Sequence, residues 1–280
     1  MTYGYKSALP RLRSLALALH AAWGLSAFAL PQGATVVNGQ VQIAQPNAGA
    51  MQIKASNGAI INWRQFSIGS GESAQFVQPG STSAVLNRVV GRDLSELMGQ
   101  LKSNGQVFLI NPNGIVIGGA ARIDTNSFVA STLDISDADF LAGKLRFLAQ
   151  PGAGAIRNEG LITAGPNGRI ALIAPDIENS GIIRAPDGNI LLAAGRKLEI
   201  ASMDLDGIRF EVQAPTDSVL NLGQLLADNG AVRVFAGSIR HSGEVRANRM
   251  AVDADGSIVL TARNSVTLTA ESATRADGAS

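Results

Sequence analysis

Glycines that recur every 20 or 21 residues are the feature that most limits how this chain can fold. Four of them follow an asparagine or histidine by two positions, with steps of 21, 42 and 20 residues: Gly160, Gly181, Gly223 and Gly243. A period near 20 with about three short apolar segments per unit is typical of a β-solenoid, because one coil cannot bury its apolar side alone. The roughly 250 residues that follow the N-terminal segment then predict about 12 coils. The irregular stretch 201–215 predicts an insertion within the 42-residue step.

The residues that precede these glycines by two positions are polar, namely Asn158, Asn179, Asn221 and His241. Stacked side-chain amides satisfy one another's hydrogen bonds, so we predict a structural ladder at one corner of the solenoid. Composition agrees with an all-β fold, since the chain has 31 glycines and is 46% hydrophobic but only 5% aromatic. A sandwich or a propeller, the competing all-β folds, does not predict the repeat. Because the chain contains no cysteine, burial and hydrogen bonds must stabilise it without disulfides.

Residues 1–29 have the three parts of a Sec-type signal peptide. These are a basic region with Lys6, Arg11 and Arg13, an apolar run over 15–25, and the cleavage site Ala27-Phe28-Ala29. The apolar run is too short to span a bilayer. We therefore expect export and a mature chain that begins near Leu30, with a buried N-terminal helix or a retained anchor as the alternatives.

The charge of the mature chain excludes some partners. Removing the three basic residues of 1–29 from the total of 23 leaves 20, against 22 acidic residues, for a net charge of −2. This balance gives no electrostatic reason to expect nucleic acid or an anionic membrane as a partner.

Residues able to support catalysis or bind a cofactor are few. The mature chain has one histidine, His241, and no cysteine, so we expect no catalytic triad, zinc site or cofactor. Asp134, Asp137 and Asp139 lack the glycine and the terminal glutamate of a calcium loop, and a polar loop or helical turn is predicted there. Gly152-Ala153-Gly154 lacks the third glycine of a dinucleotide-binding loop.

A tight turn, Asn111-Pro112-Asn113-Gly114, separates two apolar runs, 107–110 and 115–117. We predict strand, corner and strand, because Pro112 fixes its own φ and Gly114 accepts a positive φ. Two other local patterns predict a type I′ hairpin at Asn38-Gly39 and one short helix over 93–102, where Asp93 and Glu96 have the spacing of a capping box.

The order of several motifs strongly resembles a known family. These motifs are Asn62-Trp63-Arg64-Gln65-Phe66, Leu86-Asn87-Arg88-Val89, the stretch from Asn104-Gly105 through Asn111-Pro112-Asn113-Gly114, and Ala130-Ser131-Thr132-Leu133. The chain resembles the N-terminal secretion domain of two-partner-secretion exoproteins, the filamentous haemagglutinin family, and looks closest to the high-molecular-weight adhesin branch. The resemblance runs from about Ala34 to at least Gly195. The Asn-Pro-Asn-Leu motif of some members has no counterpart here.

The resemblance implies a right-handed parallel β-helix with an N-terminal cap, which we expect over residues 30–265. Residues 266–280 form no obvious cap, so we expect a disordered or truncated end there. It also implies recognition by an outer-membrane transporter through periplasmic polypeptide-transport-associated domains. The family's secretion motif falls on Asn111, Pro112, Asn113 and Gly114, with Asn87, Arg88, Asn104 and Gly105 as supporting candidates. Direct contact with the transporter and a purely structural corner both remain open for the motif. For Arg88, the alternative to contact with the transporter is a structural role as a buried, paired charge.

We therefore interpret the chain as a non-enzymatic exoprotein, exported through the periplasm to the surface of a Gram-negative cell. The resemblance implies a haemagglutinin or adhesin, which could contact host cells or glycans. One alternative is a short secreted β-helix that binds a host ligand such as a haem carrier or a glycan. The other is a polysaccharide-active β-helix enzyme, although the acidic residues here are scattered over the predicted corners.

Overall fold

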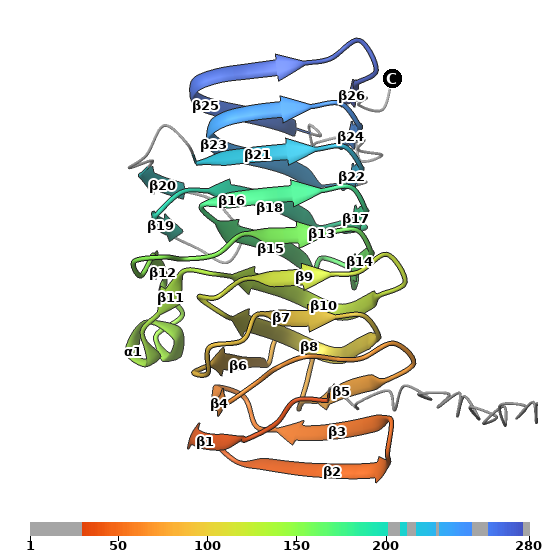
Figure 1. The fold of residues 1–280 in the computed structure, drawn as a ribbon, viewed down its shortest axis with the longest axis vertical. Coiled ribbons are helices and arrows are strands. Elements are labelled where there is room, and N and C mark those ends of the chain that lie inside the picture. Colours follow the sequence, from red (N-terminus) through yellow and green to blue (C-terminus); the bar gives the residue numbers. More distant parts are fainter. Residues whose placement is uncertain (1–29, 201–207, 212–216, 228–229, 248–256, 277–280) are drawn as a thin grey trace, which may run out of the picture.

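Parallel strands stacked in three faces make up most of the described chain (Figure 1). The structure is a computed structural model that describes residues 30–200, 208–211, 217–227, 230–247 and 257–276. The predicted signal peptide, parts of the predicted insertion and residues 277–280 lie outside the described residues. Successive coils pair in parallel along the stack, which makes the fold a parallel β-helix and confirms the all-β prediction.

The three faces are built from the following strands. The first face contains β3 (Ala50–Ala55), β5 (Ser73–Val77), the start of β8 (Gln100–Ile110) and of β10 (Arg122–Ser131), β14 (Leu161–Ala164), β17 (Ile182–Arg184), β22 (Gln224–Leu226), β24 (Glu244–Arg246) and β26 (Ala273–Arg275). The second contains β4 (Ala59–Trp63), β6 (Ala84–Val89), the ends of β8 and β10, β15 (Arg169–Ala174), β18 (Asn189–Ala194), and the starts of β23 (Ala231–His241) and β25 (Ser257–Leu268). The third contains β7 (Ser95–Leu97), β9 (Ile115–Ile117), β13 (Ile156–Asn158), β16 (Asp176–Asn179), β21 (Ser218–Asn221), and the ends of β23 and β25.

The described part of the first face stacks nine strands rather than the predicted 12 coils. Two segments leave the stack, one between β10 and β13 and one between β18 and β21. Because β16, β17 and β18 pair directly with β21, β22 and β23, the 42-residue step is one coil plus an insertion, as predicted.

An antiparallel cap closes the N-terminal end of the stack. β1 (Thr35–Asn38) pairs with β4, and β2 (Val41–Asn47) pairs with β3. The predicted Asn38-Gly39 hairpin is wrong, because β1 and β2 each pair with a later strand and only Gly39, at φ +81°, has a positive φ. Pairing with the first coil therefore determines the path of this short segment more strongly than the local turn preference does.

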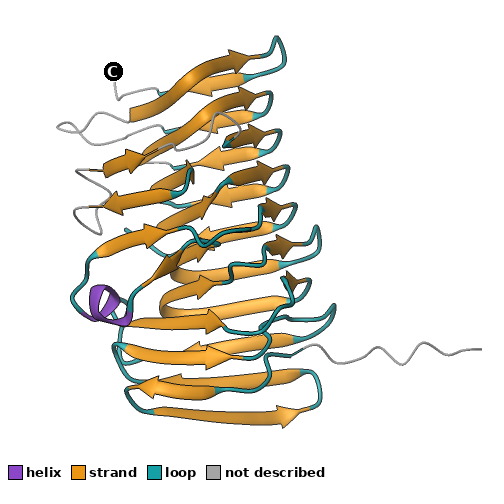
Figure 2. Cartoon of the chain, turned by 60° about the vertical axis from the view of Figure 1, so that its left-hand side comes forward, coloured by secondary structure: helices purple, strands orange, loops and turns teal. Residues whose placement is uncertain are grey.

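The two segments that leave the stack meet in a small antiparallel sheet on its side. It contains β11 (Asp134–Ile135), β12 (Leu145–Leu148), β19 (Lys197–Ile200) and β20 (Ile208–Glu211), with α1 (Asp137–Leu141) between β11 and β12 (Figures 1 and 2). It covers the outer side of the second face, where Leu86, Phe108, Val129, Ala171 and Leu191 form one buried column. The second face is thus apolar on both sides, which explains the uninterrupted run 107–110.

The helix predicted over 93–102 is wrong, and the short helix of the described chain is α1. Residues 95–97 form β7, which pairs in parallel with β9, and 100–103 begin β8. The alternation of buried Ser95 and Leu97 with exposed Glu96 fits a strand, and pairing to neighbouring coils overrides the capping-box pattern. In the described ranges, no helix is long and apolar enough to cross a membrane.

Candidate functional site

The Asn-Pro-Asn-Gly motif forms the turn that joins β8 to β9. The Gly114 N–H donates to the Asn111 carbonyl at 3.1 Å and closes the turn. Gly114 has a φ of +126°, which glycine adopts without the steric cost that a side chain would bring. Asn111 is fully buried, whereas Asn113 is exposed, so the two asparagines of the motif have different environments.

The side chain of Asn111 is fully engaged inside the protein. Its Nδ2 donates to the Asp93 carbonyl and to Ser95 Oγ, both at 3.0 Å. Its Oδ1 accepts hydrogen bonds from the backbone N–H of Asn113 at 3.0 Å and from Asn113 Nδ2 at 2.9 Å. Two donors and two acceptor positions are thereby satisfied, and the folded domain leaves no polar atom of this amide for a partner.

The turn also holds the loop over residues 90–94 of the preceding coil. Asn113 Nδ2 donates to the Gly91 carbonyl at 3.0 Å, and the Ser95 N–H donates to the Gly114 carbonyl at 3.0 Å. The loop carries two exposed apolar side chains, Val90 at 60% and Leu94 at 42% exposure. The motif therefore fixes a loop that exposes two apolar side chains beside the charged Arg92 and Asp93.

The following coil contacts the same turn from the other side. The Asn111 N–H donates to the Ser131 carbonyl at 2.9 Å, and the Gly154 N–H donates to the Pro112 carbonyl at 2.8 Å. A Cβ atom at position 154 would lie 2.5 Å from the Asn113 carbonyl oxygen, so only glycine fits there. The local pattern around Gly154 resembles only a failed dinucleotide-binding loop and gives no sign of this role. Its closeness to the motif depends on a contact across about 40 residues of sequence that the local pattern does not reveal.

Asn87, a supporting candidate, is fully buried on β6. Its Oδ1 accepts a hydrogen bond from Trp63 Nε1 at 3.0 Å, and its Nδ2 donates to the Phe108 carbonyl at 3.2 Å. The amide thereby links three coils, because it satisfies a buried indole N–H on β4 and a carbonyl on β8.

Arg88, on the same strand, anchors the extra-helical segment. Its Nε lies 3.0 Å from Asp134 Oδ1, its Nη1 lies 2.7 Å from Asp137 Oδ1, and its Nη2 donates to the Ile135 carbonyl. Burial alone lowers the pKa of Arg88, but the hydrogen bonds and charges of Asp137 and Asp134 outweigh burial and raise that pKa above its ordinary value. This geometry matches the alternative of a buried, paired structural charge. Two of the three aspartates compared above with a calcium loop, Asp134 and Asp137, are the partners of this arginine.

Asn104 and Gly105, the other two supporting candidates, lie at the bend in β8 between the first and second faces. Asn104 Oδ1 accepts from the Gln78 N–H, and Asn104 Nδ2 donates to the Gln78 carbonyl, both at 2.8 Å. A Cβ atom at position 105 would lie 2.6 Å from Gln78 Nε2. Both residues therefore hold the preceding coil at this corner, and neither lies in the turn that the motif forms.

The predicted ladder residues lie directly above one another on the third face. Asn158 Nδ2 donates to Asn179 Oδ1 at 2.7 Å, and Asn179 Nδ2 donates to Asn221 Oδ1 at 2.8 Å. Asn221 Nδ2 lies 3.0 Å from His241 Nδ1. All four side chains are at most 3% exposed, so the ladder runs inside the stack.

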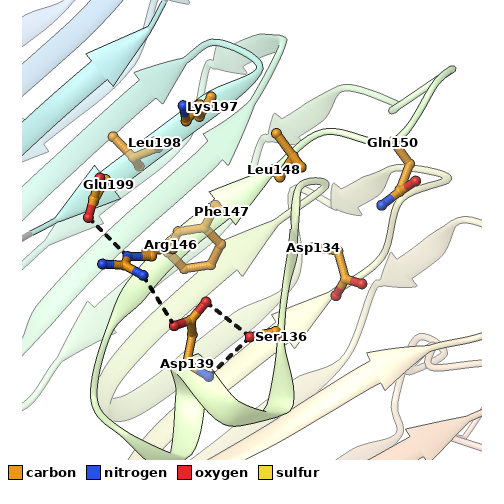
Figure 3. A pocket seen from close by; sticks show the side chains of 10 residues that line it. All are labelled: Asp134, Ser136, Asp139, Arg146, Phe147, Leu148, Gln150, Lys197, Leu198 and Glu199. Carbon is orange, nitrogen blue, oxygen red and sulfur yellow. Dashed lines mark hydrogen bonds and ion pairs between the residues drawn. The ribbon is translucent and has the colours of Figure 1, made fainter.

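A pocket of about 370 Å³ lies on the extra-helical sheet, and no residue of the motif lines it (Figure 3). Arg146 lies between Asp139, at 3.8 Å, and Glu199, at 2.9 Å. Ser136 Oγ donates to Asp139 Oδ2 at 3.0 Å. These charges pair with one another, which favours a structural role in joining α1 to β12 and β19. Within the described residues, no three histidine or acidic side chains are grouped so as to hold a metal ion.

The fold and the motif define a capped parallel β-helix in which an Asn-Pro-Asn-Gly corner joins β8 to β9 and forms hydrogen bonds with the coils before and after it. The family described as the TPS secretion domain matches residues 27–276. The chain belongs to this family of secretion domains of two-partner-secretion exoproteins, as its resemblance predicted.

Individual relatives agree with this assignment. The HMW1 secretion domain from Haemophilus influenzae is 40% identical, with a TM-score of 0.84 over 89% of this chain and 67% of that chain. A heme/hemopexin-binding protein of Haemophilus influenzae is 34% identical over 132 residues, which are 47% of this chain and 14% of that protein. Its counterpart in the strain KW20 / Rd is 36% identical over 110 residues, 39% of this chain and 12% of that protein. The matches to these two proteins thus span only about a seventh and an eighth of their lengths.

Proposed function

We propose that this domain is the part of an exoprotein that a cognate outer-membrane transporter recognises in the periplasm, through the transporter's polypeptide-transport-associated domains. Membership of the secretion-domain family supports the proposal, together with the signal-peptide pattern of residues 1–29. Export then delivers the chain to the cell surface or the medium. The domain acts by being recognised and folded, and it catalyses no reaction.

The secretion motif acts indirectly, as the brace of a contact surface. The observation that supports this role is the full engagement of Asn111, whose four hydrogen bonds all remain within the domain. The loop that the motif holds outward carries Val90 and Leu94, which are too exposed to contribute to the core, beside the exposed Arg92 and Asp93. Exposed apolar side chains next to a rigid turn suit a protein partner, because their burial on binding is favourable while little order is lost.

Three single substitutions test this role, measured by the affinity of the purified domain for the transporter's periplasmic domains and by thermal stability. Leu94→Ser should weaken binding about tenfold, the effect of losing one useful interface side chain, and leave stability unchanged. Asn111→Ala should reduce both quantities, since it leaves buried groups without partners. Leu148→Ser is the matched control, because Leu148 is a similarly exposed leucine, at 54%, on the extra-helical sheet.

The outcomes separate the role of the motif from the wider proposal. If Leu94→Ser bound the transporter with wild-type affinity, the proposed role of the motif in bracing a contact surface would be wrong. A fourth variant, Asn113→Ala, tests direct contact: lost binding at full stability would indicate that the motif itself contacts the transporter. If the unchanged domain did not bind the transporter at all, the secretion function itself would be wrong.

The activity of the whole exoprotein after export is a further part of the proposal. Similarity to the HMW1 secretion domain supports an adhesin, whereas the two relatives named for heme and hemopexin support capture of a haem carrier. Attachment of cells that express the intact exoprotein to host cells, compared with binding of haem-loaded hemopexin, distinguishes the two. Loss of attachment when the gene is deleted, without loss of hemopexin binding, is the expected result.

A further inference from the structure

The N-terminal end of the stack finishes in a strand with one unpaired edge. Among the described strands β2 pairs with β3 alone, and it lies at the outermost position of this end (Figure 1). Residues 42–47 of β2 are all exposed. Such an edge presents backbone N–H and carbonyl groups to which another strand can bind.

The hydrogen-bond pattern shows which groups of β2 point away from β3. The Ser56 N–H donates to the Gln40 carbonyl at 2.9 Å, just before the strand begins. Bonded and unbonded positions alternate along an antiparallel pair, so every second residue after Gln40 also bonds to β3. Val41 and Ile43 lie between these residues and therefore direct their N–H and carbonyl groups outward. The register shift in β2 comes only after Ala44, which leaves this part of the edge regular.

Two apolar side chains of β2 lie on the side of the sheet that faces the core. Val41 and Ile43 are paired with Ala55 and Ile53, whose side chains are buried. Side chains of directly opposed residues share one side of a sheet. Ile43 nevertheless remains 41% exposed, because no described strand lies beyond β2. A further strand on this edge would reduce that exposure.

We propose that the edge of β2 binds a second copy of this chain, so that two domains join end to end through their N-terminal caps. A two-fold axis at Gln42 places two antiparallel β2 strands with Val41 of each copy opposite Ile43 of the other. Each of these two pairs exchanges two hydrogen bonds through its outward groups, and the apolar side chains pack against each other. The Gln42 amides of the two copies meet on the solvent side, where one donates to the other.

The absence of charge favours a second copy over another partner. In a two-fold contact a charged strand meets its own charges, which repel one another. No residue from Leu30 to Ile53 has a charged side chain. Lys54 lies one strand further from the axis, on β3, so the lysines of two copies would be about 14 Å apart, beyond the screening length at physiological salt. The same segment offers a charged partner nothing that would attract it.

Sedimentation equilibrium of the secreted chain tests the proposal. We expect a dimer with a micromolar dissociation constant, because one pair of strands buries less than a standard interface. Ile43→Lys should weaken dimerisation at least about 30-fold, the effect of losing an interface hot spot, at an unchanged melting temperature. Val259→Lys is the matched control, since Val259 is similarly exposed, at 39%, on β25 at the other end of the stack. A chain that stays monomeric at millimolar concentration would overturn the proposal.

A cysteine cross-link tests the register without changing the apolar side of β2. The chain contains no cysteine, and Gln42 is exposed, so Gln42→Cys should fold like the unchanged chain. The two Cα atoms at position 42 would be about 4.5 Å apart, within the range that a disulfide spans. Mild oxidation should link Gln42→Cys chains at least about tenfold faster than Val259→Cys chains, because the dimer raises the local concentration of the thiols. Equal rates would contradict the pairing.

Hydrogen exchange separates a second copy from the transporter as the occupant of this edge. Exchange at Val41 and Ile43 should slow as the concentration of the chain rises, with no transporter present. If it slowed only when the transporter's periplasmic domains were added, β2 would bind a strand of the transporter and dimerisation would be wrong. The inference is independent of the proposed secretion function, because a chain that the transporter did not bind would still dimerise.

Discussion

Arg88 on β6 and Asp137 on α1 form an ion pair with 2.7 Å between Nη1 and Oδ1, although 49 residues separate them in the sequence. The same guanidinium reaches Asp134 at 3.0 Å, and the side chain of Arg88 is only 15% exposed. One charged residue near the end of β6 thus attaches the extra-helical segment to the β-helix.

Replacing Arg88 with methionine should lower the free energy of unfolding by about 1–3 kcal/mol, because two carboxylates and a carbonyl lose their charged partner. The estimate stays below that for a fully buried pair, since Asp134 and Asp137 are 37% and 41% exposed. Denaturant unfolding gives the magnitude, and hydrogen exchange of α1 and β12 should accelerate most. Arg146→Met is the matched control: this 53% exposed arginine also pairs with two acids, and its loss should cost less than about 1 kcal/mol. Equal effects of both changes would contradict the anchoring role.

Replacing Asn179 with alanine should destabilise the domain by about 2 kcal/mol or more. The change leaves Asn158 Nδ2 without its acceptor and Asn221 Oδ1 without its donor, and both groups are buried. Chemical denaturation measures the loss. Arg157→Ala, on an exposed side chain of the neighbouring coil, should change stability by less than about 0.5 kcal/mol. A mild effect of Asn179→Ala would mean that water replaces the missing amide.

Gly188→Ala should disturb the stacking of coils. An added Cβ atom would overlap with the carbonyl oxygen of Gly168 in the coil before it, so the backbone must shift, at a cost of about 1–3 kcal/mol or more. Gly80→Ala is the control, since a Cβ atom there would meet nothing within 4 Å and Gly80 has no positive φ. Thermal unfolding of the two variants should differ clearly, and similar melting temperatures would show that the coils can move apart freely.

Signal peptidase should cleave the chain after Ala29, because small residues occupy positions 27 and 29 around the scissile bond. Mass spectrometry of the exported protein should give an N-terminus at or near Leu30. An Ala29→Arg variant should remain uncleaved and attached to the cells. An exported wild-type chain that still begins with Met1 would favour the retained anchor.

Local patterns predicted some elements well and others poorly. The corner at Asn111-Pro112-Asn113-Gly114 is a turn because proline fixes its own φ and glycine accepts a positive φ, whatever residues surround them. Residues 93–102 and Asn38-Gly39 have equally clear local signals, yet both were predicted wrongly. In each case a strand of the stack pairs with the segment, and this pairing outweighs a local preference of about 1 kcal/mol.

The sequence by itself determined the repeating architecture of this protein. Spacing of glycines and ladder asparagines near 20 residues allows only a stack of coils, because each coil exposes an apolar side that the next one must cover. Only the tertiary structure decided which faces of the coils meet other elements. The pairing of β12 with β19, the partners of Arg88 and the loop that Asn113 holds all join residues at least 20 positions apart outside the repeat. Such contacts form when the stack brings segments together, and no local periodicity records them.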